Sequence, residues 1–126
     1  MPRNISFALT TEPFKNRTKT VSRRLGWWED KKRRRIIRAG DLLMGCEKCH
    51  GIEKGGLVRL GLIQVVDVRR EPLNLMLYPD YGSDEVVKEG FPNLTGGEFV
   101  DMFCSHMNCN QHEDVTRIEF EYVDEE

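Results

Sequence analysis

The chain has 126 residues, of which 39% are apolar, so it suits one ordinary domain with a small core. This composition excludes a collagen, a coiled coil, a disulfide-dense toxin and a fully disordered chain. The net charge of −2 hides a split, because residues 1–70 carry a net charge of +10 and residues 71–126 a net charge of −12. No apolar run is long enough to cross a membrane, and the first residues lack the apolar core of a secretion signal. We therefore expect one domain over residues 1–126 that stays in the cytoplasm.

The first half of the chain predicts short strands separated by loops. An apolar strand is expected over Ile5–Leu9, and a short helical turn begins at Thr11. The basic segment Arg17–Arg24 is interpreted as a functional loop or a short strand. Strands are then expected over Leu42–Met44 and over the β-rich run Leu57–Val68, where Val and Ile dominate.

The second half predicts two helices and a closing strand. The first helix should begin at Ser83 and end before Gly90, and the second should begin with a capping box of Thr95 and Glu98. The second helix then carries a core-facing stripe at helical spacing: Phe99, Met102, Phe103 and His106. Alternating residues over 117–123 predict the last strand, and the tail 124–126 should be frayed. Strands at both chain ends around central helices predict an α+β fold with a small mixed sheet or barrel.

The four cysteines form two closely spaced pairs, Cys46 with Cys49 and Cys104 with Cys109. Two thiolate pairs on separated segments can close a tetrahedral zinc site, with nearby histidines (50, 106 and 112) as substitute ligands. The alternative is that Cys104 is a small core residue and the others are thiols near the surface. A disulfide framework is a poor interpretation in a chain without a secretion signal.

A basic segment follows two tryptophans. Residues 31–38 contain six Lys or Arg side chains, and Trp27 and Trp28 lie just before them. Cations that attract phosphates, next to rings that stack on unpaired bases, are typical of a nucleic-acid patch. The alternative is a solvated loop that balances the acidic second half, which agrees with the pI of about 6.0.

An ordered set of motifs resembles the ASCH domain family of the PUA-like superfamily, in versions common in bacterial and phage genomes. The motifs span most of the chain: Lys19-Thr20-Val21-Ser22-Arg23-Arg24, Gly40-Asp41, the strand 61–73, Glu89-Gly90-Phe91 and the strand 115–123. The resemblance implies a small PUA-like mixed β-barrel with flanking helices. It also implies a cleft lined by the Lys19–Arg24 segment and the helix end at Glu89.

The resemblance further implies that the partner is RNA or a modified nucleoside or nucleotide. Within the cleft segment, Arg24 matches an arginine of the family that can hold a phosphate or a base edge. We expect the ligand-binding residues to lie in this segment and in the basic segment: Thr20, Arg23, Arg24, Trp27, Trp28, Lys31, Lys32, Arg33, Arg34 and Arg35. One positive face near the cleft and an acidic face opposite would follow.

Some members of the family are amidohydrolases that deacylate N4-acetylcytidine with a lysine, a threonine and a glutamate. Lys19, Ser22 and Glu89 match these positions, with Ser22 in place of the threonine. A hydroxyl nucleophile needs a base, and a lysine can serve once its pKa is lowered. Three hypotheses therefore stay open: a nucleotide-binding domain, such an amidohydrolase, and a structural zinc-binding interaction module. The alternative role for Lys19 and Glu89 is a structural ion pair.

Overall fold

The computed structural model of the protein describes residues 2–48 and 56–124. Five strands form one mixed sheet in the order β1-β3-β4-β5-β2. Their bounds are Arg3–Ser6 for β1, Val21–Arg24 for β2, Leu42–Cys46 for β3, Arg59–Pro72 for β4 and Asp114–Tyr122 for β5. The β1–β3 pair is parallel and the other three pairs are antiparallel. The sheet curls into a half-barrel. Together with the three helices described below, it confirms the predicted α+β class.

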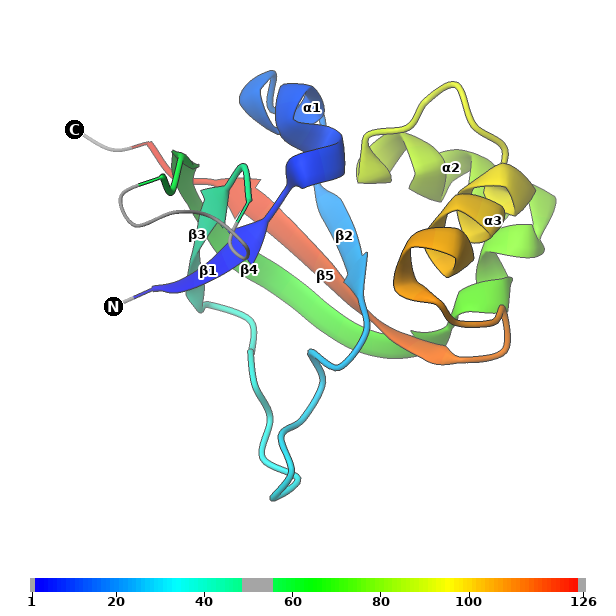
Figure 1. Ribbon diagram of the computed structural model, residues 1–126, viewed down its shortest axis with the longest axis horizontal. Coiled ribbons are helices and arrows are strands. Elements are labelled where there is room, and N and C mark those ends of the chain that lie inside the picture. Colours follow the sequence, from blue (N-terminus) through cyan, green and yellow to red (C-terminus); the bar gives the residue numbers. More distant parts are fainter. Residues whose placement is uncertain (1, 49–55, 125–126) are drawn as a thin grey trace.

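The helices lie at the end of the sheet and along its side (Figure 1). Two short 3-10 turns, η1 (Ala8–Thr10) and η2 (Leu73–Leu77), precede the helices α1 (Thr11–Lys15) and α2 (Pro79–Glu89). The last helix, α3 (Gly96–Met107), packs beside α2. No helix in the described part of the chain is long and apolar enough to span a membrane.

Of the three ends predicted for α2 and α3, two are confirmed and one is wrong. α2 stops at Gly90, which adopts the left-handed conformation, and the capping box of Thr95 and Glu98 starts α3. The expected start of α2 at Ser83 is wrong, because the helix already begins at Pro79. Proline at the first helical position needs no hydrogen-bond partner for its nitrogen and has a fixed φ, so it starts this helix one turn earlier.

Two apolar clusters hold the elements together. The first lies between the sheet, η1 and α1 and is formed by Ile5, Phe7, Phe14, Ile37, Leu43, Ile63, Val65, Ile118 and Phe120. The second lies among η2, α2, α3 and the start of β5 and is formed by Leu73, Met76, Val86, Phe99, Val100, Phe103 and Val115. The alternation predicted for the last strand is confirmed from Ile118 onward, because Ile118 and Phe120 are buried while Glu121 is exposed, but Arg117 is buried as well.

Two glycines allow α2, α3 and η2 to meet at short range. A methyl group on Gly82 would lie 2.2 Å from the carbonyl oxygen of Met76, and one on Gly96 would lie 1.9 Å from the same oxygen. Real side chains do not approach a backbone oxygen so closely. The neighbouring Gly97 is different, because the nearest atom to its added methyl would be 3.9 Å away.

We therefore predict opposite effects for two adjacent substitutions. Gly96→Ala should lower the free energy of unfolding by about 3 kcal/mol, because the backbone of η2 must move. Gly97→Ala should leave it unchanged or raise it by up to about 1 kcal/mol. Urea unfolding followed by circular dichroism measures both. Equal stabilities of the two variants would contradict the close packing of α3 on η2.

Candidate functional site

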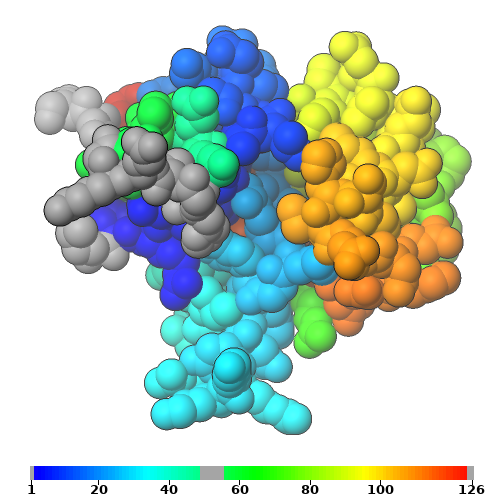
Figure 2. Space-filling view, in the orientation of Figure 1, coloured from blue at the N-terminus to red at the C-terminus, as the bar shows by residue number. Residues whose placement is uncertain are grey.

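A pocket of about 160 Å³ lies between η1, β2 and α3. In Figure 2 the surface is hollowed between η1, drawn in blue, and α3, drawn in orange. We call it the α3 pocket; its lining residues are Ser6, Phe7, Ala8, Leu9, Thr10, Lys19, Ser22, Arg23, Arg24, Glu89, Phe91, Phe99, Met102, Phe103, His106 and Met107. All three residues predicted as catalytic, Lys19, Ser22 and Glu89, are therefore in one pocket.

The pocket has a polar side that depends on how α2 ends. Gly90 stops the helix, so the carbonyl group of Glu89 has no partner within α2 and faces a cation instead. The Nζ atom of Lys19 donates to this carbonyl at 2.6 Å and to Oε1 of Glu89 at 3.2 Å. Arg23 donates from Nη1 to Oε2 of Glu89 at 2.9 Å. Two cations at the negative end of a helix dipole stabilise this arrangement.

Behind this polar side, Arg23 connects β2 to two further glutamates. Its Nη2 atom donates to Glu85 at 2.5 Å and to Glu71 at 3.1 Å, and its side chain is 0% exposed. Arg117 on β5 contacts the same Glu85 from Nε at 2.6 Å and from Nη2 at 3.1 Å. We call Arg23, Glu71, Glu85, Glu89 and Arg117 the buried charge network. It joins β2, β4, β5 and α2 behind the pocket.

The pKa values of two buried groups are both lowered, but for different reasons. Desolvation lowers the pKa of Lys19 to about 8, although the nearby Glu89 carboxylate acts in the other direction. For Glu85, burial alone would raise the pKa, but hydrogen bonds from Arg117 and Arg23 lower it to about 2. With a pKa of about 8, Lys19 loses its proton at a lower pH than an ordinary lysine, whereas Glu85 is an anion at neutral pH.

Ser22 is buried and has a role in its own strand. Its Oγ accepts a hydrogen bond from Nε of Arg24 at 2.9 Å. Nη2 of Arg24 donates in turn to the carbonyl oxygen of Ser6, so this side chain bridges the two outer strands β1 and β2. Among the described residues, Ser22 and Lys19 share no hydrogen bond.

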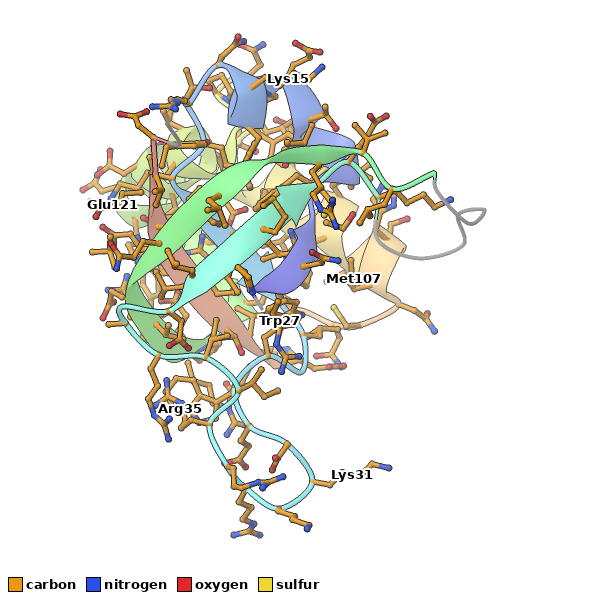
Figure 3. The ribbon with its side chains drawn as sticks, turned by 90° about the vertical axis from the view of Figure 1, so that its left-hand side faces the viewer. Lys15, Trp27, Lys31, Arg35, Met107 and Glu121 are labelled. Carbon is orange, nitrogen blue, oxygen red and sulfur yellow. The ribbon has the colours of Figure 1, made fainter. Side chains whose placement is uncertain are left out.

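Most of the other predicted binding residues lie outside the α3 pocket. Arg23 and Arg24 line it, whereas the remaining ones do not: Thr20, Trp27, Trp28, Lys31, Lys32, Arg33, Arg34 and Arg35. The backbone of Thr20 is held by Lys88 and Phe120. The basic segment forms a separate projection from the body, which Figure 3 shows with Lys31 at its far end. The expectation that this segment borders the cleft was wrong.

The sequence predicted the residues of the apolar wall of the pocket only in part. The stripe on α3 was predicted as core, and Phe99 and Phe103 are indeed buried, but the same helix also turns Met102, His106 and Met107 to the pocket. A helical period cannot separate a core face from a pocket face. The partners of Arg23 were missed as well, because Glu71 and Glu85 belong to distant segments and no local spacing connects them to β2.

The cysteines come together only in part. The sulfur atoms of Cys104 and Cys109 are 3.8 Å apart at the end of α3, and Cys46 is buried at the end of β3. Cys49 and His50 lie outside the described residues. Within residues 2–48 and 56–124, no three His, Cys, Asp or Glu side chains are grouped as metal ligands. The four-cysteine zinc site stays a prediction.

Comparisons with known proteins define the fold. No family model matches the sequence, and no curated protein matches it. Among solved structures, protein EF3133 from Enterococcus faecalis V583, assigned to the DUF984 family, superposes with a TM-score of 0.67 at 15% identity, over 98% of this chain and 81% of that one. An ASCH domain from Lactobacillus crispatus JV V101 superposes with a TM-score of 0.60 at 13% identity, over 95% of this chain and 78% of that one. The chain therefore has an α+β fold of the ASCH type.

The buried charge network makes a prediction about stability. Glu85→Gln should lower the free energy of unfolding by about 3–5 kcal/mol, because Arg23 and Arg117 lose a shared buried anion. The control is Asp84→Asn on the exposed side of α2, which should change it by less than about 0.5 kcal/mol. Denaturant unfolding at neutral pH measures the difference, and similar values for both variants would contradict the role of Glu85.

The same residue predicts acid sensitivity. The pKa of Glu85 in the folded chain is about 2, below its ordinary value of 4.5. Its contribution is therefore fully present above about pH 4.5 and is lost as the pH falls toward about 2. Unfolding measured across this range should show a steeper loss of stability for the native chain than for Glu85→Gln. Parallel curves would contradict this account.

Proposed function

We propose that the chain is an RNA- or nucleotide-binding domain whose α3 pocket takes one base or nucleoside of the ligand. The observation that carries the proposal is the combination of a hydrogen-bonding side and an aromatic wall in one pocket. Lys19, Ser22 and Glu89 form the polar side, and Phe99 and Phe103 belong to the wall. Proteins recognise an unpaired base by hydrogen bonds to its edge and by contact of its face with aromatic side chains.

The size and charge of the pocket support a base rather than a phosphate. A cavity of about 150 Å³ holds a benzene-sized ring, and the α3 pocket measures about 160 Å³. Lys19 is paired with Glu89, and Arg23 is paired with Glu89, Glu71 and Glu85, so neither cation is free for a phosphate. The ASCH-type fold agrees with this proposal.

Calorimetric titration with cytidine, N4-acetylcytidine and a short single-stranded RNA tests the proposal. Ser22→Ala should weaken the tightest of these interactions about tenfold, because one hydrogen bond worth about 1.4 kcal/mol is lost. Ser105→Ala, on the exposed side of α3, is the matched control and should bind like the native chain. The proposal fails if none of the ligands shows saturable binding, or if Ser22→Ala binds as tightly as the control.

A second candidate function is hydrolysis of an N4-acylated cytidine, and the lowered pKa of Lys19 favours it. In this reaction a neutral Lys19 takes the proton of Ser22 as the hydroxyl oxygen attacks the acyl carbon. The proton then passes to the departing amine, and water cleaves the acyl ester of Ser22. In the structure Lys19 donates to Glu89, so its Nζ atom must turn toward Ser22 before this step.

The second candidate predicts a particular pH dependence. Because the neutral amine of Lys19 is the active form and its pKa is about 8, the rate should rise with pH, reach half its maximum near pH 8 and level off above. Lys19→Arg stays charged and should be inactive. Release of cytidine, followed by chromatography, measures the rate. A Ser22→Ala variant with the native rate would exclude the proposed nucleophile.

A further inference from the structure

Residues 27–38 form a projecting hairpin, which we call the basic arm. Figure 1 shows it leaving the end of β2 and standing away from the sheet and helices. Its two sides are joined by a bridge between Glu29 and Arg35 and by a hydrogen bond from the amide of Ile36 to the carbonyl of Trp28 at 3.2 Å. The arm therefore has a defined shape, although it lies outside both apolar clusters for most of its length.

Asp30 organises the tip of the arm. Its Oδ1 atom accepts the backbone amides of Lys32 and Arg34 at 2.8 and 2.9 Å, and its own amide donates to the carbonyl of Arg34 at 2.9 Å. These bonds close a loop of three residues, Lys31, Lys32 and Arg33. Such loops end in a residue with left-handed backbone, and Arg33 has a φ of 61°.

The residue in that left-handed position is informative. Glycine adopts this conformation without steric cost, whereas a residue with a Cβ atom is strained there. The loop thus carries an arginine at the position that favours glycine, and this places a third cation at the tip of the arm. Arg33 lies beside Lys31 and Lys32, and all three side chains are exposed.

Some cations of the arm are paired with other side chains, and others are not. Arg34 is paired with Asp30 at 2.8 Å, and Arg35 stacks on the ring of Trp28 with 3.6 Å to its centre. Lys31, Lys32 and Arg33 take part in no ion pair among the described residues. Residues 29–38 carry six basic and two acidic side chains, a net charge of +4.

The two tryptophans serve the arm itself. Trp28 is covered by Arg35, and Trp27 packs against the first apolar cluster with Arg3 5.8 Å from the centre of its ring. Each ring therefore has an arginine over one of its faces, and both side chains are half-buried. The hypothesis that the rings stack on unpaired bases stays a prediction. No large apolar side chain is exposed on the arm, so it also lacks an anchor for a lipid surface.

We propose that Lys31, Lys32 and Arg33 at the tip of the basic arm bind the backbone phosphates of a nucleic-acid duplex. This proposal deepens the proposed function, on which it rests for the kind of ligand. Contacts by cations without stacking rings favour the form with the higher charge density, and a duplex carries more charge per length than a single strand. The major groove of B-DNA admits a two-stranded ribbon, and the arm has a comparable hairpin shape, with one bridge between its two sides. Since β2 supplies the pocket and leads into the arm, the ligand is an unpaired base beside a helical segment.

The test compares two arginines with the same backbone conformation. Arg17 has a φ of 60° and pairs with Asp124. It follows α1, which Figure 1 shows on the other side of the molecule from the basic arm. Arg33→Gly and Arg17→Gly each remove one charge and relieve one left-handed residue. Fluorescence anisotropy with an RNA duplex, a DNA duplex and the corresponding single strand, at several salt concentrations, measures binding by the full chain.

We expect Arg33→Gly, but not Arg17→Gly, to weaken binding of a duplex. Arg33→Gly should raise the Kd for a duplex and reduce the slope of log K against log salt by about 0.9, the value for one phosphate contact. Its thermal midpoint should stay the same or rise, and Arg17→Gly should bind the duplex like the native chain. The two duplexes distinguish RNA from DNA as the source of the phosphates.

Other results would overturn the proposal. They are equal duplex binding by the Arg33→Gly and Arg17→Gly variants, tighter binding of the single strand than of either duplex, or tighter binding to phosphatidylserine vesicles than to nucleic acid. Titration of the same variants with a nucleoside keeps this test separate from the pocket. Arg33→Gly should bind a nucleoside normally, whereas Ser22→Ala should keep the native salt slope for a duplex.

Discussion

The guanidinium group of Arg23, buried among Glu71, Glu85 and Glu89, is the constraint on which the pocket depends. A buried cation is costly unless its donors are paired, so β2 must lie where three carboxylates from β4 and α2 converge. That position also brings Lys19 to the end of α2. The polar side of the α3 pocket is therefore a consequence of pairing in the interior.

The ion pairs behind the pocket explain part of the uneven charge of the two chain halves. Cations from the basic first half are paired with glutamates from the acidic second half, and Arg117 is the exception that comes from the second half itself. What remains of the positive charge is concentrated on the basic arm. Pocket and arm thus offer two chemistries on one domain, hydrogen bonds and rings in the pocket and uncompensated cations at Lys31, Lys32 and Arg33.

The sequence predicted the α+β class, the caps at Gly90 and Thr95, and the grouping of Lys19, Ser22 and Glu89, since local signals and an ordered set of motifs report these features. It could not predict that Arg23 serves the interior, because its partners come from remote segments. Nor could it predict that Arg35 covers one face of Trp28, because this contact depends on the fold of the arm.

Methionine methyl groups provide the most direct test of the central claim, that the α3 pocket is the ligand site. Met102 and Met107 line this pocket, Met44 lines a second hollow with Arg17 and Arg59, and Met76 is in the core. In a chain labelled with ¹³C at these methyls, N4-acetylcytidine should shift the signals of Met102 and Met107 and leave those of Met44 and Met76 in place. A shift of Met44 with Met102 and Met107 unchanged would contradict the account.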